Sequence, residues 1–394
     1  MKHISRTVWI LSFVSMFTDA ASEMLYPIMP IYLKTIGFSI VLIGILEGVA
    51  EATAGLSKGY FGKLSDNSGR RVPFVQIGYA FSVISKPMMA VFIFPLWIFF
   101  ARTLDRLGKG IRTGARDAIL SDEATPETKG KVFGFHRSMD TFGAVLGPLS
   151  ALLYLYYYPQ DYKTLFYIAF IPGVLAVLTS LYLKDKKNME IVSRKKSVPF
   201  FSFLTYWKTS PIAYRKLTLG LLAFALFNSS DIFLLLKAKE AGLDDTAVIG
   251  VYIFYNLVYA LFAFPAGIVS DKMGFKKMFI IGLILYAFVY LGMGLSTNIF
   301  AVIAMFFLYG IYASATEGIS KAWISNIVHK KDIATAIGTY AGFQSICTML
   351  ASTFAGLIWY QFGSSATFIV TGLTTVLIII YFGVSVRKPA QKVI

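Results

Sequence analysis

The chain is poor in cysteine and in charge. It has one cysteine, Cys347, in 394 residues, which excludes an internal disulfide. Only 15% of the residues are charged, whereas 56% are hydrophobic. A soluble domain of this length could not bury so much apolar surface, so most of the chain is expected to lie in a lipid bilayer.

Acidic residues are the scarcer of the two charges, with 21 Asp and Glu against 37 Lys and Arg and a net charge of +16. Such an excess could indicate nucleic-acid binding. The basic residues are instead concentrated in short loops between apolar runs, which is the positive-inside pattern of membrane proteins. We therefore expect no nucleic-acid partner. The sequence also shows no nucleotide-binding loop, metal-ligand cluster or nucleophile–base spacing, so we expect no cofactor, no metal and no enzymatic activity.

A helix needs about 20 largely apolar residues to cross a bilayer. With that length the chain divides into about twelve spans. The first has no small-residue cleavage site, so we expect it to be retained. The expected spans are 8–33, 40–64, 72–92, 94–118, 132–157, 162–184, 215–237, 246–270, 276–296, 298–323, 334–361 and 363–386.

The longest polar segment, 185–214, separates six spans from six. We expect a first domain at 1–184, a cytoplasmic linker at 185–214 and a second domain at 215–394. Trp207 and the pair Phe200-Phe201 suggest that part of the linker is an amphipathic helix on the membrane surface. Because Lys and Arg gather on one side of the predicted spans, both termini should be cytoplasmic.

One short motif occurs twice, each time in a basic loop between two apolar spans. The second copy follows the first by 205 residues. A membrane protein built from two related halves is usually a secondary transporter. The paired positions are Gly62 and Gly267, Asp66 and Asp271, and Gly69 and Gly274.

The first copy, with Arg70 and Arg71 after Gly69, resembles the signature loop of the major facilitator superfamily between the second and third helices. Ser65 and Asn67 depart from the usual pattern. The resemblance implies an all-α integral membrane fold of about twelve transmembrane helices in two pseudo-symmetric six-helix bundles, which work by alternating access.

In that family the loop aspartate and arginine form a cytoplasmic gate with charges at the end of the fourth helix. Here Arg112, Arg116 and Asp117 stand in that place. A buried Asp66 carboxylate can also face a helix N-terminus. The alternative is an ordinary solvated turn that carries topology charge.

The fifth span contains Gly134, Gly143 and Gly147-Pro148, a spacing similar to the family's antiporter motif, although Ala151 and Leu152 replace its final glycine pair. That resemblance implies export. The alternative is plain packing of small residues between membrane helices, which implies no direction.

Ionisable residues inside the predicted spans are costly in lipid and are candidate functional groups. Arg102 and Arg106 could bind a carboxylate or phosphate through two parallel hydrogen bonds. A balanced set of charges can also be a structural ion-pair network, and the sequence leaves both interpretations open. The candidate proton carriers are Asp19, Glu23, Glu51 and Asp140.

The second half has fewer such residues. Asn228 and Asp231 lie in the seventh span and are candidate substrate ligands. Tyr340 and Gln344 are one turn apart in the eleventh span and could line the same cavity. For Tyr340, packing or a place in an interfacial belt is the favoured alternative.

These patterns together predict a proton-coupled secondary transporter in the cell's inner membrane, where it acts as a monomer. The substrate is expected to be a small organic anion or zwitterion, with export (antiport) favoured. One alternative is a proton symporter that imports an organic anion or a siderophore. A second, of another class, is a membrane receptor that transports nothing.

Overall fold

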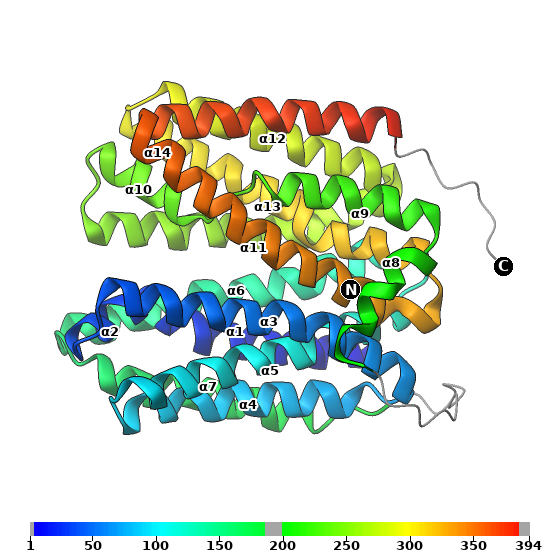
Figure 1. Ribbon diagram of the computed structural model, residues 1–394, viewed down its shortest axis with the longest axis horizontal. Helices are drawn as coiled ribbons and strands as arrows, with labels where there is room; N and C mark the ends of the chain where they lie inside the picture. The colour runs from blue at the N-terminus through cyan, green and yellow to red at the C-terminus, as the bar shows by residue number, and fades with distance from the viewer. Residues whose placement is uncertain (1–3, 186–198, 386–394) are drawn as a thin grey trace. The chain divides into compact units, whose positions relative to one another are not determined.

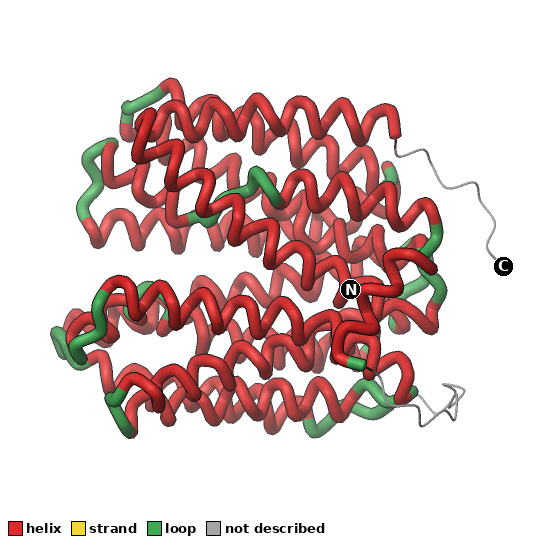
Figure 2. Tube along the Cα trace, viewed as in Figure 1, coloured by secondary structure: helices red, strands yellow, loops and turns green. Residues whose placement is uncertain are grey.

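The computed structural model describes residues 4–185 and 199–385. Within these residues all regular secondary structure is helical, and no strand is present (Figure 2). The predicted linker residues 186–198 and the basic residues Lys2, Arg387 and Lys388 lie outside the described residues. The all-α expectation is confirmed for the described part of the chain.

The helices of the first half match the predicted spans (Figure 1). Spans two to six each correspond to one helix, and the first span is divided between α1 and α2. The elements are α1 (Arg6–Leu25), α2 (Met29–Thr35), α3 (Ile40–Ser68), α4 (Val72–Val91), α5 (Pro95–Asp122), α6 (Lys129–Tyr157) and α7 (Tyr162–Ser180).

The second half repeats this order, and its seventh span is likewise divided, between α9 and α10. The last two spans form a single element, α14, which is interrupted at Gly363 by a left-handed φ of 84°. The elements are η1 (Phe200–Thr205), α8 (Tyr206–Thr209), α9 (Ile212–Ala225), α10 (Ile232–Glu240), α11 (Asp245–Met273), α12 (Phe275–Leu295), α13 (Ile299–Ile327), η2 (Lys330–Asp332) and α14 (Ile333–Ser385).

Among the described residues, eight helices are long and apolar enough to cross a membrane. α5 is not one of them, because it carries the stripe of charges that begins at Arg102. α9 and α10 are too short, with 14 and 9 residues. The chain is a multi-pass membrane protein, and the count of twelve crossings stays a prediction.

The interruptions of the first and seventh spans fall at equivalent positions. α1 ends before Pro27, and α9 and α10 are separated by residues 226–231. The 205-residue shift places Tyr26 opposite Asp231. Discontinuous helices at matching places in two repeats are where transporters commonly bind substrate, because the break frees backbone and side-chain polar groups.

Two compact units can be distinguished, and each is described by itself. The first unit comprises residues 1–123, 139–206 and 330–342, and the second comprises 124–138, 207–329 and 343–394. The start of α6 thus groups with the second unit, and the start of α14 groups with the first. The predicted domain boundaries at 184 and 215 stay a prediction.

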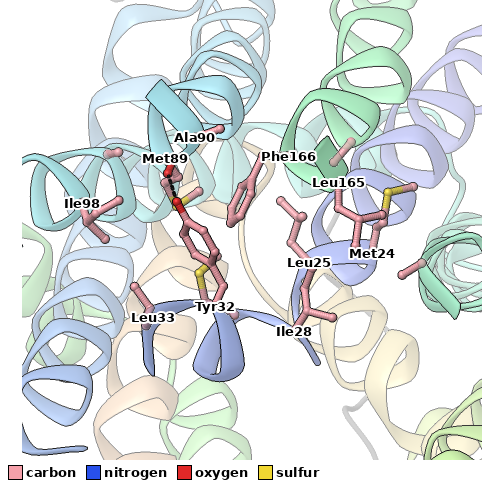
Figure 3. Packing of buried hydrophobic residues seen from close by; sticks show 14 of the residues in the cluster. Met24, Leu25, Ile28, Tyr32, Leu33, Met89, Ala90, Ile98, Leu165 and Phe166 are labelled. Atoms are coloured by element: carbon pink, nitrogen blue, oxygen red, sulfur yellow. Dashed lines mark hydrogen bonds between the residues drawn. The ribbon is translucent and has the colours of Figure 1, made fainter. Parts of the chain in front are cut away.

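In the first unit, α4 packs against α5 and α7, α3 against α5, and α1 against α7 (Figure 1). A buried cluster surrounds the α1–α2 break (Figure 3). Tyr32 of α2 donates a hydrogen bond to the carbonyl oxygen of Met89 at 2.9 Å, and its ring centroid lies 4.8 Å from that of Phe166. Dispersion contacts of this kind hold the interrupted helix in place where lipid supplies no hydrophobic driving force.

Residues 199–206 of the linker belong to the first unit. Phe203 of η1 is buried, and its ring occupies the space that a side chain at Gly59 of α3 would need. Lys63 of α3 donates to the carbonyl oxygen of Ser202 at 2.6 Å. The predicted amphipathic segment is thus helical only in short pieces, and its place on a membrane surface stays a prediction. In the second unit, α13 packs against both α11 and α12.

Candidate functional site

The carboxylate of Asp66, the first of the two duplicated loop aspartates, contacts the beginning of α14. It accepts hydrogen bonds from the backbone N–H and the hydroxyl of Thr335, at 2.7 and 2.8 Å. Thr335 is in the first turn of α14, where backbone N–H groups have no partner within the helix and the dipole favours negative charge. The Asp66 carboxylate therefore provides the acceptor that the Thr335 N–H lacks within its own helix.

Asp271 makes the equivalent contact in the second unit. Its two carboxylate oxygens accept from the backbone N–H groups of Gly130 and Lys131, at 2.7 and 2.8 Å. Both donors lie in the first turn of α6. The duplicated aspartates thus bind the N-termini of two helices that are themselves equivalent, α14 and α6.

The glycines of the motif permit this approach. A Cβ atom at Gly62 would lie 2.4 Å from the carbonyl oxygen of Ala334, and one at Gly267 would lie 2.2 Å from that of Gly130. These distances exclude any side chain without movement of backbone. Gly69 and Gly274 have φ angles of 65° and 94°, in the left-handed region that glycine adopts at no steric cost.

The arginine that supports the first loop is Arg71, whereas Arg70 is exposed. The buried Arg71 guanidinium contacts Asp66 at 3.2 Å, pairs with Asp122, and donates to the carbonyl oxygen of Lys330. Asp66 lies beyond the predicted span 40–64. Burial raises the pKa of its carboxyl to about 6, although Arg71 and Thr335 act in the opposite direction.

The charges predicted to pair with this loop make other contacts. Arg112 donates to the Ser82 hydroxyl at 2.6 Å and lies 4.5 Å above the Tyr79 ring. Arg116 donates to Asp117 at 3.0 Å. The residue of α5 that reaches the loop is Asp122, at the last position of the helix.

The glycine spacing of α6 corresponds to close helix packing. Cβ atoms at Gly143 and Gly147 would lie 2.2 and 2.5 Å from the carbonyl oxygens of Met16 and Ala20 in α1. A Cβ at Gly134 would lie 2.6 Å from the carbonyl oxygen of Ala263 in α11. The motif therefore allows α6 to approach other helices through backbone contact.

Arg102, one of the two predicted substrate arginines, is already paired. Its Nε and one terminal nitrogen donate to the two oxygens of Glu47 at 2.8 and 2.9 Å, the bidentate geometry that suits a guanidinium. Arg102 also lies 3.5 Å from Asp105, which pairs with Lys86 at 3.1 Å. This part of the predicted set is an ion-pair network that joins α3, α4 and α5.

Arg106 is held more loosely. Its terminal nitrogens lie 3.8 Å from Glu47 and 3.6 Å from Glu51, within ion-pairing range but beyond hydrogen-bonding distance. Its Nε is buried and makes no hydrogen bond. The Glu51 side chain is 44% exposed. Arg106 therefore retains donor capacity that Arg102 has already used.

The remaining candidate proton carriers lie nearby in the first unit. Asp140 is buried and accepts a hydrogen bond from Ser15, whose hydroxyl also accepts from Arg116 at 3.2 Å. Asp19 and Glu23 are half-buried on α1, and Asp19 lies within electrostatic reach of Lys109. Both aspartates are therefore within electrostatic reach of cations of α5.

In the second unit, Asn228 and Asp231 lie in the α9–α10 break, among tyrosines that the sequence analysis did not single out. Asp231 accepts from Tyr255 and from Tyr309, each at 2.6 Å. Asn228 accepts from Tyr286 at 3.1 Å and donates to Tyr312 at 3.4 Å. The i, i+3 spacing of Tyr309 and Tyr312 was the available sequence signal, because it places both rings on one helical face.

Tyr340 and Gln344 are one turn apart on α14, as expected, with Tyr340 buried and Gln344 half-buried. The structure brings Arg102 and Arg106 together around Glu47, and it brings Asn228 and Asp231 together among the tyrosines. These two groups belong to different units. Within residues 4–185 and 199–385, no group of three or more His, Cys, Asp or Glu side chains is arranged to hold a metal ion.

Comparisons with known proteins agree with this architecture. The sequence profile of the Major Facilitator Superfamily matches residues 9–255 and 232–393. The chain is 33% identical over 364 residues to the uncharacterized MFS-type transporter MJ1317 of Methanocaldococcus jannaschii, covering 91% of this chain and 89% of that protein. It is 25% identical to the Staphyloferrin B transporter of Staphylococcus aureus over 93% of this chain and 89% of that protein.

The crystal structure of the human organic anion transporter MFSD10 (TETRAN) superposes with a TM-score of 0.81, at 15% identity, over 96% of this chain and 99% of that chain. A likeness at this identity shows the fold. The family profile and the relative at 33% identity define a multi-pass membrane transporter and not an enzyme. The chain belongs to the Major Facilitator Superfamily, as the loop resemblance predicted.

Proposed function

We propose that this protein is a proton-coupled transporter that moves a small anionic or zwitterionic organic solute by alternating access. The observation that carries the proposal is the incomplete hydrogen bonding of the Arg106 guanidinium. The Arg106 side chain is 15% exposed, its buried Nε makes no hydrogen bond, and its two carboxylate neighbours lie at 3.6 and 3.8 Å. A carboxylate on the solute would supply the bidentate hydrogen bonds that Glu47 and Glu51 leave unmade.

Arg102 takes a different role in this proposal. Glu47 already occupies it in bidentate fashion, so an anionic solute would have to displace a well-placed partner. We assign Arg102 to the scaffold that orients Glu47. Glu47 then becomes the shared partner through which Arg102 and Arg106 act together.

Proton coupling is proposed at the carboxylates beside these cations. Glu51 has an exposed side chain and a loose contact to Arg106, so we assign to Glu51 the proton that is exchanged for the solute. Asp140 and Asp19 remain the further candidates, with Glu23 on the same helix. An exchange of partners between a proton and a solute is the linkage that a coupled transporter requires.

Alternating access is supported by the two equivalent loop contacts. Asp66 and Asp271 bind the N-termini of α14 and α6 through the same chemistry. We assign both aspartates to a gate on the cytoplasmic side. Arg71, and not Arg70, supports this gate, and Arg112 and Asp117 fix the position of α5 beside it. The glycines that allow the close approach are Gly62, Gly69, Gly267 and Gly274. Both termini on the cytoplasmic side, an inner-membrane location and a monomeric state belong to the same proposal.

Export is the proposed direction, because close α1–α6 packing at Gly143 and Gly147 accompanies the antiporter-like spacing. Symport of an organic anion or a siderophore is the second candidate, and the similarity to a staphyloferrin B transporter supports a small organic solute in either direction. Tyr340 and Gln344 stay candidate substrate ligands. A receptor that transports nothing is disfavoured by membership of a family of transporters.

The test uses the full chain in proteoliposomes with a pH-sensitive dye inside. Addition of organic anions and zwitterions to one face should evoke proton flux for some solutes. Glu51→Gln should abolish the flux, and Arg106→Lys should weaken it because an ammonium cannot form the planar two-bond contact. Glu127→Gln, in an exposed loop, is the matched control. The proposal fails if no solute evokes flux, or if Glu51→Gln and Arg106→Lys both behave like the control.

A further inference from the structure

The α9–α10 break carries an acidic group that the proposed anion site does not use. Asp231 is the residue immediately before α10, six residues after α9 ends at Ala225. Ionisable residues within a membrane-spanning region are costly unless they have a function or a compensating partner. A compensating partner for the Asp231 carboxylate is therefore expected among its neighbours.

Its contacts among the described residues are two neutral phenols, from Tyr255 of α11 and Tyr309 of α13. No lysine or arginine within residues 4–185 and 199–385 forms an ion pair with it. This differs from the acidic side chains of the first unit, where Glu47 and Asp105 each contact an arginine. The negative charge at Asp231 is thus solvated by hydrogen bonds, while Arg137, the cation within electrostatic reach, contacts Glu317 and forms no ion pair with Asp231.

The surrounding groups are rich in hydrogen-bond acceptors. The phenol oxygen of Tyr309 donates to Asp231, and such an oxygen can still accept a hydrogen bond. Asn228 is joined to this cluster through Tyr286 and Tyr312, whose ring centroids lie 4.7 Å apart. The hydroxyls of Ser229 and Tyr290 are buried beside this cluster. Three helices, α11, α12 and α13, and the break therefore place neutral oxygens around one carboxylate.

The tyrosine rings of this cluster are less exposed to solvent than its two polar residues, Asn228 and Asp231. The rings of Tyr255, Tyr286, Tyr309 and Tyr312 are at most 5% exposed, which fixes them by packing. Asn228 and Asp231 are only half-buried. Aromatic rings at close range also stabilise a cation through their quadrupoles. The polar groups can thus be reached while the aromatic groups that hold them stay in place.

We propose that Asp231, with Tyr255, Tyr309 and Asn228, is a subsite for a protonated amine of the transported solute. A primary or secondary ammonium supplies both the charge and the N–H donors that this set of acceptors lacks. The proposal rests on the transport function above and narrows its substrate class to solutes that carry an ammonium group, of which zwitterions are one kind.

The test measures ligand-dependent thermal stabilisation of the full chain in detergent, because a ligand that binds only the folded protein raises its Tm. The probes are hexylamine and benzylamine, which are compared with hexanol and benzyl alcohol. A third probe, benzyltrimethylammonium, has a positive charge but no N–H donor. We expect the two amines to stabilise the wild type more than their alcohols and more than the quaternary cation.

Asp231→Asn should lower the affinity for the amines by about tenfold or more, as loss of a charge-assisted hydrogen bond predicts. Tyr309→Phe should lower it by a smaller factor. Asp244→Asn is the matched charge control, since asparagine still caps α11 in place of the exposed Asp244. Tyr360→Phe, at a side chain that is 89% exposed, is the matched control for the hydroxyl.

The proposal is overturned if no amine stabilises the wild type more than its alcohol, or if stabilisation survives Asp231→Asn. It is also overturned if Na⁺ alone reproduces the stabilisation, which would identify an inorganic cation site. If Asp231→Asn abolishes proton flux without changing amine binding, Asp231 is a proton carrier and the amine site is rejected. If anions evoke proton flux but amines do not stabilise the protein, the amine subsite is rejected and the transport proposal stands. If amines bind but no solute evokes proton flux, the transport proposal is rejected and the amine site stands.

Discussion

Removal of the Asp66 carboxylate should open the first turn of α14. In Asp66→Ala, the backbone N–H and the hydroxyl of Thr335 lose acceptors that lie at 2.7 and 2.8 Å. Hydrogen bonds to a charged group contribute about 1.5–3 kcal/mol each, and water can replace part of that at an opened helix end. We expect the free energy of local opening to fall by about 1.5–3 kcal/mol, which is about 10- to 150-fold in the opening equilibrium.

Amide hydrogen exchange measures this quantity directly, because exchange of a protected amide follows its opening equilibrium. Peptides that contain Thr335 should exchange about 10- to 150-fold faster in Asp66→Ala than in the wild type. Asp66→Asn keeps one acceptor oxygen, so its effect should be less than about tenfold. Both comparisons are made on the full chain in detergent at constant pH.

The chain contains its own control in the second copy of the motif. Asp271→Ala should speed exchange at Gly130 and Lys131 and leave Thr335 unchanged, while Asp66→Ala should do the reverse. Unchanged exchange at Thr335 in Asp66→Ala would refute the role of this contact. Equal acceleration of both segments in either variant would show general destabilisation and would also count against it.

Three further outcomes are expected. Burial raises the pKa of Asp66 from 3.8 to about 6, so between these pH values the folded protein keeps a proton that the unfolded chain releases. The stabilising contribution of this proton therefore falls as the pH rises from about 4 to 6. Asp66→Asn should flatten this part of a curve of Tm against pH. Gly143→Ala should lower the Tm because its Cβ would lie 2.2 Å from Met16 O, whereas Gly48→Ala, with nothing within 4 Å, should not; equal shifts would contradict the packing argument. Arg102→Ala should destabilise the protein by about 1–3 kcal/mol, because Glu47 loses two hydrogen bonds to a charged group. The double variant with Glu47→Ala should recover part of this loss. A double variant no more stable than the single would argue against a structural pair.

The sequence by itself determined the class of protein and most of its helices. Apolar runs of about 20 residues are a consequence of bilayer thickness, so their number and order can be read without any tertiary contact. The 205-residue repeat likewise located Asp66 and Asp271, because two copies of one loop must serve two equivalent structures. The positive φ angles at Gly69 and Gly274 agree with this, since glycine is the residue that adopts them freely.

Only the tertiary structure decided which charges meet. The sequence placed Arg102 and Arg106 one turn apart on one stripe and could not separate them, yet Glu47 binds the first in bidentate fashion and leaves the second with a free Nε. Periodicity reports the face on which a side chain lies and does not report the partner across the helix interface.

The tyrosines around Asp231 show the same limit. They come from α11, α12 and α13 and converge on a break in a predicted span, so no local pattern joins them. The break itself was hidden because residues 226–231 interrupt an otherwise apolar run only briefly. Membrane thickness dictates where a helix is needed, whereas the packing of several helices around a polar group dictates where one can end.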